Sequence, residues 1–414
     1  MHRFVYAVCG ERYYIETLNF SLAFLRKFSN YPIWIITDSA RNEIPISHNN
    51  IVDIRTPVEY NNHQASIFLK TGLSIFLPKM EQGISCYLDS DVIVLGPECN
   101  NIFHNYNPPV SFAPDHCAFG EYSPHAFQCS CEEEFVAGAE TFRQKIKGYF
   151  PDFSFDSQQA NADLKKLTAL FGEMKKHPLR NTSTIIRYLI ARYIFPVEKV
   201  QLGEFVFMKK NRCWYNANNE MISFDNRYHR KKLWKKHRIF FNNGDCYDEN
   251  HRLLTPRTAH CTHLSEYLKK KYGVDIPTSW RHWNGGVFLF DFRSEEFMKC
   301  WHNTVQHEFS NSLTKTRDQS ALAMCVWKNR LEQHPTLPVA FNFITGIGSG
   351  NIRWNADTGY STPDANQIPD IHFLHVCNRW GDASWDIWQS VLSLAAREGI
   401  EMNGDAGVPY SSKN

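Results

Sequence analysis

Two aspartates separated by one serine are the strongest sign of chemistry in the sequence. Asp89, Ser90 and Asp91 follow the apolar run Ile84–Leu88. At the end of a strand, or in the turn after it, two carboxylates at this spacing can reach one cation. Hard divalent ions such as Mg²⁺ and Mn²⁺ prefer oxygen ligands and bridge substrate phosphates. A strand-ending turn capped by aspartates gives the same pattern without chemistry, so the structural context has to decide.

Two histidines near the carboxyl end of the sequence are candidate metal ligands. His372 and His375 lie three positions apart in the apolar run Ile371–His375, which is typical of a strand. Residues at this spacing face opposite sides of a sheet, so one can bind a metal while the other packs. An ordinary buried histidine is the alternative for each of them.

Two further groups combine turn or helix signals with polar side chains. Asn284, Gly285 and Gly286 are typical of a tight turn, and glycines also let backbone approach a ligand closely. Asp318 and Gln319 stand at the start of a helical pattern, where an aspartate caps the helix or complements its dipole. Both groups therefore have a structural and a functional interpretation.

The elements that position these residues alternate between strands and helices. Apolar runs predict strands at 4–8, 32–38, 51–54, 84–88, 286–290 and 371–375. Helical spacing predicts helices at 14–28, 66–76, 161–174, 182–194, 294–309 and 318–327. Strands that alternate with helices favour an α/β fold with a mostly parallel sheet, whose ligands bind beyond the carboxyl ends of the strands.

Composition narrows the class of protein. The 45 Lys and Arg nearly balance the 43 Asp and Glu, which argues against a non-specific nucleic-acid binder. The 43% hydrophobic content is ordinary for a globular protein, and no apolar run is long enough to span a membrane. With no secretory-type leader in the first residues, we expect a cytoplasmic protein. The basic segment Arg227–Arg238 is typical of a solvated surface, and its chemistry also suits a membrane or an anionic saccharide.

Twelve cysteines are too few for a disulfide scaffold in a chain of 414 residues. The closest groupings are Cys117/Cys129/Cys131 and His260-Cys261-Thr262-His263. Their spacings match no standard zinc finger, so buried thiols are the favoured interpretation and a zinc site is the alternative.

The run Tyr87–Val94 resembles the metal-binding strand of GT-A glycosyltransferases, in particular glycosyltransferase family 8. Five other segments occur in the order of that family: Val5–Cys9 with Tyr13, Trp283–Asp291, Arg317–Leu322, Leu337–Asn342 and Ile371–Trp380. The resemblance covers residues 1–112 and 280–381. It implies a GT-A (Rossmann-like) fold and a retaining enzyme that moves a hexose from a UDP-sugar with Mn²⁺ or Mg²⁺.

The resemblance also implies roles for individual residues. The metal ligands would be Asp89, Asp91 and His372. Contacts to the nucleotide and the donor sugar would come from Ala7, Tyr13, Lys70, Asp89, Ser90, Asn284, Gly285, Gly286 and Arg379. The residues beside the reacting carbon would be Asp318 and Gln319. The acceptor would be a saccharide or a glycolipid, with no role for nucleic acid.

The sequence departs from the family in two places. In the closing motif, His375 replaces a glycine, Asn378 a lysine and Arg379 a proline, so we expect Arg379 to supply the cation for the pyrophosphate. The segment 113–279 is much longer than the family's connection. We therefore expect a catalytic domain of residues 1–112 and 280–390, a largely helical insertion at 113–279 that shapes the acceptor site, and a flexible tail at 404–414.

Two other functions remain open from the sequence. A haloacid-dehalogenase-type phosphatase also carries D-x-D after a strand, although normally after the first one. A non-catalytic saccharide-binding protein with a decayed site is the second alternative. A sugar-nucleotide pyrophosphorylase is disfavoured because no G-x-G-x-R loop follows the first strand.

Overall fold

The computed structural model describes residues 2–153, 158–242, 245–251, 254, 261–314, 317–345, 353–355, 359–361 and 370–401. The chain forms two compact units: unit 1 comprises Met1–Cys129 and His260–Asn414, and unit 2 comprises Ser130–Ala259. The sequence analysis expected the insertion to span residues 113–279. In the structure, the segments 113–129 and 260–279 belong to unit 1 instead. The expected tail at 404–414 lies outside the described residues.

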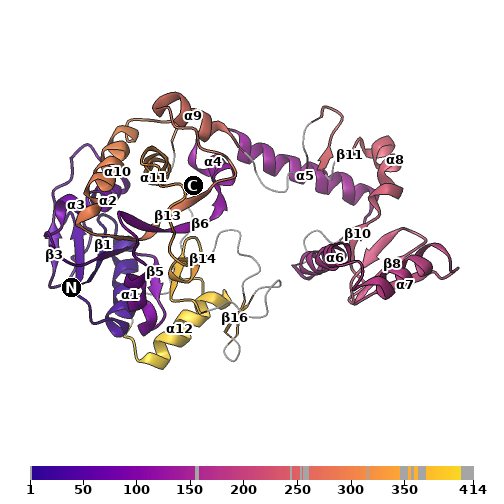
Figure 1. Ribbon diagram of the computed structural model, residues 1–414, viewed down its shortest axis with the longest axis horizontal. Helices are drawn as coiled ribbons and strands as arrows, with labels where there is room; N and C mark the ends of the chain where they lie inside the picture. Colours follow the sequence, from indigo (N-terminus) through magenta and orange to yellow (C-terminus); the bar gives the residue numbers. More distant parts are fainter. Residues whose placement is uncertain are drawn as a thin grey trace. The chain divides into compact units, whose positions relative to one another are not determined.

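Unit 1 is built on a six-stranded sheet with the order β3-β2-β1-β4-β13-β6 (Figure 1). Its strands are β1 (Arg3–Ala7), β2 (Ile33–Thr37), β3 (Ile51–Asp53), β4 (Ser85–Leu88), β6 (Val110–Ala118) and β13 (Arg281–Phe290). The first four pair in parallel, and β13 runs antiparallel to both β4 and β6. This confirms the predicted α/β fold with a mostly parallel central sheet.

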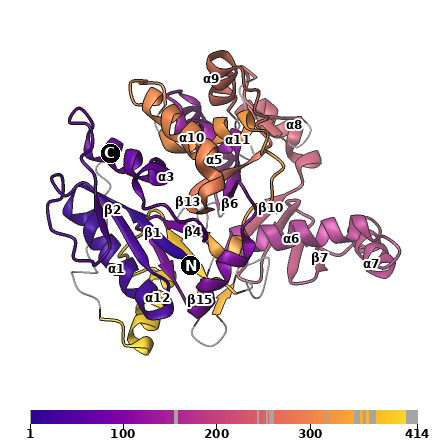
Figure 2. The ribbon, with the colours of Figure 1, turned by 60° about the vertical axis from the view of Figure 1, so that its left-hand side comes forward.

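Helices cover both faces of this sheet because successive strand residues point to opposite sides (Figure 2). Phe4 and Tyr6 face a core that includes α1 (Arg12–Phe28) and α12 (Asp386–Glu398). Val5 faces a second core, formed with α2 (Asn62–Thr71), α10 (Glu295–Glu308) and α11 (Arg317–Lys328). Burial of these apolar side chains on both faces is the main favourable contribution to the stability of the layered unit.

The predicted helix at 66–76 is two helices in the structure, α2 and the short α3 (Leu73–Phe76). A capping box between Asn61 and Gln64 begins α2, and Gly72 separates the two helices. A Cβ at Gly72 would lie 2.2 Å from the Phe76 ring, so any other residue at this junction would force that ring to move. The break leaves Lys70 in the last turn of α2.

A small three-stranded sheet joins the carboxyl-terminal part of unit 1 to the segment after the two aspartates. Its order is β14-β17-β5, with β14 (Phe343–Thr345) parallel to β17 (Phe373–Val376) and β17 antiparallel to β5 (Val92–Val94). The other elements of unit 1 are η1 (Pro97–Asn105), α4 (Phe119–Ala126), α9 (His263–Tyr272), η2 (Phe292–Ser294), η3 (Val339–Phe341), β15 (Arg353–Asn355) and β16 (Gly359–Ser361).

Unit 2 contains the two helices predicted at 161–174 and 182–194, and also further helices and strands that the sequence pattern did not predict. Its helices are α5 (Cys131–Tyr149), α6 (Gln158–Lys176), α7 (Thr182–Tyr193) and α8 (Asn226–His237). Its strands form a hairpin, β11 (Phe240–Asn242) with β12 (Asp245–Tyr247), and an antiparallel sheet of β7 (Lys199–Leu202), β8 (Phe205–Met208), β9 (Cys213–Tyr215) and β10 (Met221–Phe224). Helices α6 and α7 lie against this sheet (Figure 1). Their apolar residues pack around Phe207 and Trp214 of the sheet.

Among the described residues, no helix combines the length and the apolar character needed to cross a bilayer.

Candidate active site

The two aspartates lie at the carboxyl end of β4, as the sequence analysis predicted. The backbone N–H of Asp89 donates to the carbonyl of Gly286 on β13 (2.8 Å), which holds the end of β4 against its neighbour. The N–H of Val92 then donates to the carbonyl of Asp89 (3.1 Å), closing a turn that leads into β5. The motif therefore occupies the edge of the sheet where α/β folds bind ligands.

A cavity of about 370 Å³ opens at this edge of the sheet. Seven of the predicted site residues line it: Ala7, Tyr13, Lys70, Asp89, Ser90, Asp91 and Asp318. The sequence analysis did not assign the others, among them Asn62, His63, Ser66 and Cys377. Residues distant in the sequence thus converge on one pocket, with three carboxylates on its wall.

Lys70 joins two of these carboxylates. Its Nζ lies 3.1 Å from Asp89 Oδ1 and 3.2 Å from Asp318 Oδ2. Burial opposes the charge on Lys70, yet Asp89 and Asp318 together raise its pKa above the ordinary value. Burial also opposes the charge on Asp318 and by itself would raise the pKa of that carboxyl. The nearby Lys70 ammonium outweighs the effect of burial, so the pKa of Asp318 lies below its ordinary value. Lys70 therefore stays a cation, and Asp318 an anion, on the wall of the pocket.

The structure brings His375, rather than the predicted ligand His372, to Asp91. His375 on β17 places Nε2 3.4 Å from Asp91 Oδ1, because β17 pairs with β5 in the register His375–Val92. His372 lies next to Leu95, beyond the other end of β5: the carbonyl of His372 accepts a hydrogen bond from the N–H of Leu95. The His372 ring packs on Phe341. Three residues of strand separate the two histidines by about 10 Å, so the same register that brings His375 to Asp91 carries His372 away.

A chain of side-chain hydrogen bonds fixes the orientation of the His375 ring. Asp115 Oδ2 accepts from Asn284 Nδ2 (2.9 Å), which turns Asn284 Oδ1 toward Asn342 Nδ2 (3.0 Å). Asn342 then presents Oδ1 to His375 Nδ1 at 2.9 Å, so Nδ1 carries the proton of this bond. Nε2 is left to face Asp91. Metal-binding histidines are commonly held through their second nitrogen in this way.

The donor set at Asp91 fits a divalent cation. Asp91, His375 and Cys377 each place one ligand atom within 4.8 Å of the other two. Burial lowers the pKa of His375, but the Cys377 sulfur and the Asp91 carboxylate outweigh it and raise that pKa well above its ordinary value. A proton and a metal ion would therefore compete for Nε2.

Asn284, Gly285 and Gly286 lie within β13 rather than in the tight turn that the sequence suggested. The two glycines make room there for the His375 ring and for Gln319. A Cβ at Gly286 would lie 2.3 Å from Cε1 of His375, which is closer than side chains can approach. At Gly285 a Cβ would meet Gln319 Oε1 at 3.0 Å. Neither glycine is among the residues that line the pocket.

Gln319 and Arg379 lie differently from what was expected of them. Gln319 Nε2 donates to the carbonyl of Trp283 (2.8 Å) and its Oε1 accepts from the N–H of Gly285 (2.9 Å), so its amide holds β13. Arg379 pairs with Asp382 through Nε and Nη2 (2.8 and 2.5 Å) and stacks over Trp385. Gln319 and Arg379 are both absent from the pocket lining.

Sequence reasoning missed Asp115 and Cys377 and assigned His375 to packing. The only signal for Asn342 was its place after Phe341 in the resemblance to family 8. Asp115 lies in β6, which had not been predicted as a strand, so nothing in the pattern linked it to Asn284. The chain of hydrogen bonds from Asp115 through Asn284 and Asn342 to His375 forms only because strands distant in the sequence pair with each other.

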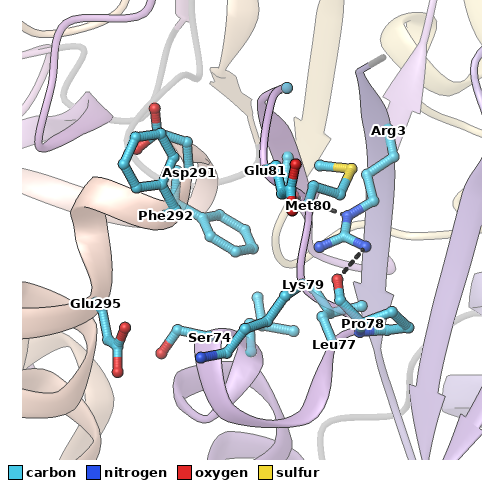
Figure 3. Close-up of a pocket in the computed structure, with 14 residues that line it drawn as sticks. Arg3, Ser74, Leu77, Pro78, Lys79, Met80, Glu81, Asp291, Phe292 and Glu295 are labelled. Atoms are coloured by element: carbon cyan, nitrogen blue, oxygen red, sulfur yellow. Dashed lines mark hydrogen bonds between the residues drawn. The ribbon is translucent and has the colours of Figure 1, made fainter.

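A second cavity, of about 470 Å³, lies at the opposite edge of the sheet (Figure 3). Arg3 and Ser85, the first residues of β1 and β4, line it. The Arg3 guanidinium bonds to Ser85 Oγ and to the carbonyl of Pro78, and Asp291 bonds to Arg293. None of the predicted site residues lines this second cavity, whereas seven of them line the smaller cavity at Asp91, which is therefore the better candidate active site.

No protein-family model and no curated protein matches this chain. Among solved structures it is similar to apo WbbM, a bifunctional glycosyltransferase, with 10% identity and a TM-score of 0.39 over 96% of this chain and 49% of WbbM. The chain therefore spans about half the length of WbbM.

Two other similar structures are those of galactosyltransferase LgtC with donor and acceptor sugar analogues and of mouse xyloside xylosyltransferase 1 in its apo form. LgtC shows 10% identity and a TM-score of 0.38, with 95% of each chain covered. The mouse enzyme shows 10% identity and a TM-score of 0.35, with 93% of this chain and 98% of that one covered. All three are glycosyltransferases, but similarity at this level does not assign the present chain to a family.

Proposed function

We propose that this protein is a metal-dependent glycosyltransferase that moves a hexose from a UDP-sugar to a saccharide or lipid-linked acceptor, with retention at the anomeric carbon. The observation that carries the proposal is the approach of His375 Nε2 to Asp91, with the ring fixed from behind by Asn342. This arrangement stands beside Asp89 in a pocket at the carboxyl end of the sheet. The ordered motifs of family 8 support the choice of donor and the retention.

In this proposal Asp89, Asp91 and His375 hold Mn²⁺ or Mg²⁺, and His372 is replaced in that role. Asp89 is also oriented by the Tyr87 hydroxyl (2.6 Å) and by Lys70. A divalent cation held there would neutralise charge on the departing diphosphate. Cys377 is close enough to favour a softer ion as well, since thiolate ligands suit Zn²⁺ better than Mg²⁺.

The residues around the cation have distinct proposed tasks. Lys70 is a fixed positive charge for the diphosphate, and Ala7, Tyr13 and Ser90 line the part of the pocket proposed for the nucleotide. Asp318 keeps a negative charge on the pocket wall, where it would stabilise positive charge that develops on the sugar. Asn284, Gly285, Gly286 and Gln319 position the His375 ring and β13 rather than contact the donor.

The proposed acceptor and partners rest on composition and resemblance. Unit 2 is proposed to shape the acceptor site. The basic segment Arg227–Arg238 falls largely on α8, where Tyr228 and Trp234 are 45% and 39% exposed. Exposed aromatic and basic side chains together suit an anionic saccharide or the surface of a membrane.

Thermal-shift measurements with UDP, GDP, CMP and ADP, each with and without Mn²⁺, test the proposal without knowledge of the acceptor. A ligand that binds only the folded state raises the melting temperature by mass action. We expect stabilisation by UDP that depends on Mn²⁺, followed by release of UDP from a UDP-hexose when acceptors are supplied. Release of phosphate from simple phosphate esters would favour the phosphatase instead, and UDP-sugar binding without turnover would favour the saccharide-binding protein.

A further inference from the structure

Three cysteines and a histidine come together at the points where the chain leaves and re-enters unit 1. Cys129 is the last residue before unit 2 and Cys131 follows two positions later, while Cys261 and His263 stand at the return. The three sulfurs and one imidazole nitrogen all lie within 4.8 Å of one another. Two groupings that are far apart in the sequence thus form one cluster.

The spacing of the cluster is close to that of a tetrahedral zinc site, with one sulfur–sulfur distance at the ideal edge and one sulfur–nitrogen distance somewhat shorter than it. Sγ of Cys129 and Sγ of Cys261 are 3.8 Å apart, and Nδ1 of His263 lies 3.2 Å from Sγ of Cys261. Zn–S and Zn–N bonds of about 2.3 and 2.0 Å give tetrahedral edges of about 3.8 Å between two sulfurs and about 3.5 Å between sulfur and nitrogen. Three cysteines and one histidine are also a standard donor set for structural zinc.

The surroundings of Cys261 favour a sulfur that accepts hydrogen bonds. The N–H of Leu264 donates to Ser123 Oγ (3.1 Å), so the Ser123 hydroxyl proton points to Cys261 Sγ, also at 3.1 Å. A metal-bound thiolate is a better acceptor than a thiol, and such outer hydrogen bonds commonly orient zinc ligands. Cys261 itself is 2% exposed.

The backbone around Cys129, Cys261 and His263 is held by unit 1. The N–H of Cys261 donates to the carbonyl of Gly120 on α4 (2.9 Å), and the N–H of Gln128 donates to the carbonyl of Leu313 (2.8 Å). The His263 ring, at the start of α9, lies parallel to that of Phe127. Most of the cluster is therefore pre-formed by ordinary packing.

From these contacts we infer that Cys129, Cys131, Cys261 and His263 bind one structural Zn²⁺, which fastens together the two ends of the inserted segment. On binding, the three thiol protons pass to solvent, and His263 keeps its remaining proton on Nε2. This site is separate from the proposed active-site cation, whose ligands are different residues. It does not depend on the proposed transferase activity.

Metal analysis of the full-length protein tests the inference. The protein, purified without a metal-affinity tag and desalted in the presence of a weak chelator, should retain about one zinc ion per chain. Cys261→Ser and His263→Ala should lose that zinc. The matched controls Cys300→Ser and His307→Ala, and the active-site variant Asp91→Asn, should keep it. Loss of zinc from Asp91→Asn but not from Cys261→Ser would overturn the assignment.

Cobalt substitution of the wild-type protein gives a second measurement, and this one needs no variant. Co²⁺ in place of zinc should give the sulfur-to-metal charge-transfer band and the intense visible bands of a tetrahedral thiolate site. His263 is exposed, so its replacement by Ala should leave the fold intact while it changes this spectrum. His263→Cys should restore zinc binding. Wild-type protein with three reduced thiols and no retained metal, or with a Cys129–Cys261 disulfide found by mass spectrometry, would refute the site.

Discussion

His375 Nε2 lies 3.4 Å from Asp91 Oδ1, while His375 Nδ1 is bonded at 2.9 Å to Asn342 Oδ1. The two nitrogens of one imidazole are therefore used differently: one is fixed to the protein interior, and the other faces a carboxylate on the pocket wall. This pre-orientation is what a metal site needs, because the ring does not have to be ordered when the ion binds. Hydrogen bonds through Asn342 connect His375 of β17 to Asn284 of β13, and Asn284 in turn bonds to Asp115 of β6.

Asp91→Asn should remove the response of the protein to Mn²⁺. The amide loses the charge that attracts the cation, so stabilisation by UDP with Mn²⁺ and transfer activity should both fall to background. The variant should melt close to the wild-type temperature, because Asp91 is on the pocket wall rather than in the core. Asp275→Asn, at an exposed aspartate of unit 1, is the matched control. Full activity in a folded Asp91→Asn protein would exclude the metal assignment.

The two histidines should behave oppositely. His375→Ala should abolish Mn²⁺-dependent stabilisation by UDP, whereas His372→Ala should retain it, since His372 lies about 10 Å along the strand. Asn342→Ala leaves both ligands in place but frees the ring, and metal affinity should drop about 10- to 100-fold. Titration of each variant with Mn²⁺ at fixed UDP measures these affinities. The reverse ranking of the two histidine variants would restore His372 as the ligand.

Gly286→Ala tests the space that this glycine of β13 leaves for the His375 ring. The added Cβ would lie 2.3 Å from the imidazole, so the ring has to move and Mn²⁺ binding should be lost. Overpacking of this kind typically costs about 1 to 3 kcal/mol of stability. Gly172→Ala in α6 has open space around its Cβ and should be neutral or slightly stabilising. Thermal melts and Mn²⁺ titrations of both variants give the comparison, and unchanged metal affinity in Gly286→Ala would contradict it.

Lys70→Met should damage both stability and nucleotide binding. Without the ammonium, Asp89 and Asp318 face each other's charge in a partly buried site, and breaking such a pair costs about 3 to 5 kcal/mol. Adding Asp318→Asn should recover part of the melting temperature, because it removes one of the two stranded charges. It should not recover UDP binding. Equal melting temperatures for the single and double variants would argue against the ion-pair account.

Glu308 gives a prediction about stability and pH that is independent of the active site. It is 1% exposed, and Lys271, Tyr267, Tyr272, Asn311 and Thr314 all donate hydrogen bonds to its carboxylate. Burial raises its pKa, but these donors outweigh burial and lower that pKa below the ordinary value of 4.5. A lowered folded-state pKa stabilises the protein above the pKa of the unfolded chain, and that stability is lost as the pH falls through the folded-state pKa.

Glu308→Gln should therefore lower the free energy of unfolding by about 2 to 3 kcal/mol near neutral pH. The difference from wild type should shrink as the pH falls below about 4.5. Urea unfolding of both proteins across this range measures it. Glu295→Gln, at an exposed glutamate of α10, should show almost no difference at any pH. A wild-type advantage that persists undiminished at acid pH would show that the charge of Glu308 is not its source.

The sequence by itself determined the parts of this protein that depend on local patterns. Apolar periodicity located β1, β2, β3, β4, β17 and part of β13, together with most helices of unit 1 and with α6 and α7 of unit 2. The apolar run before Asp89 placed the motif at a strand end. Local patterns work there because each element is long or apolar enough to express its period. The strands of unit 2 are three or four residues long, and α5 is polar over most of its surface, so neither was predicted.

Only the tertiary structure decided which side chains meet. From the sequence, either His372 or His375 was a candidate metal ligand. The register of β17 on β5 decides that His375 is the histidine that faces Asp91. The hydrogen-bonded chain Asp115–Asn284–Asn342 joins β6, β13 and the end of η3, and no local sequence pattern connects these three elements. Cys129 and Cys131 meet Cys261 and His263 for the same reason. Contacts between distant segments depend on how packed elements align, and that alignment is a property of the whole fold.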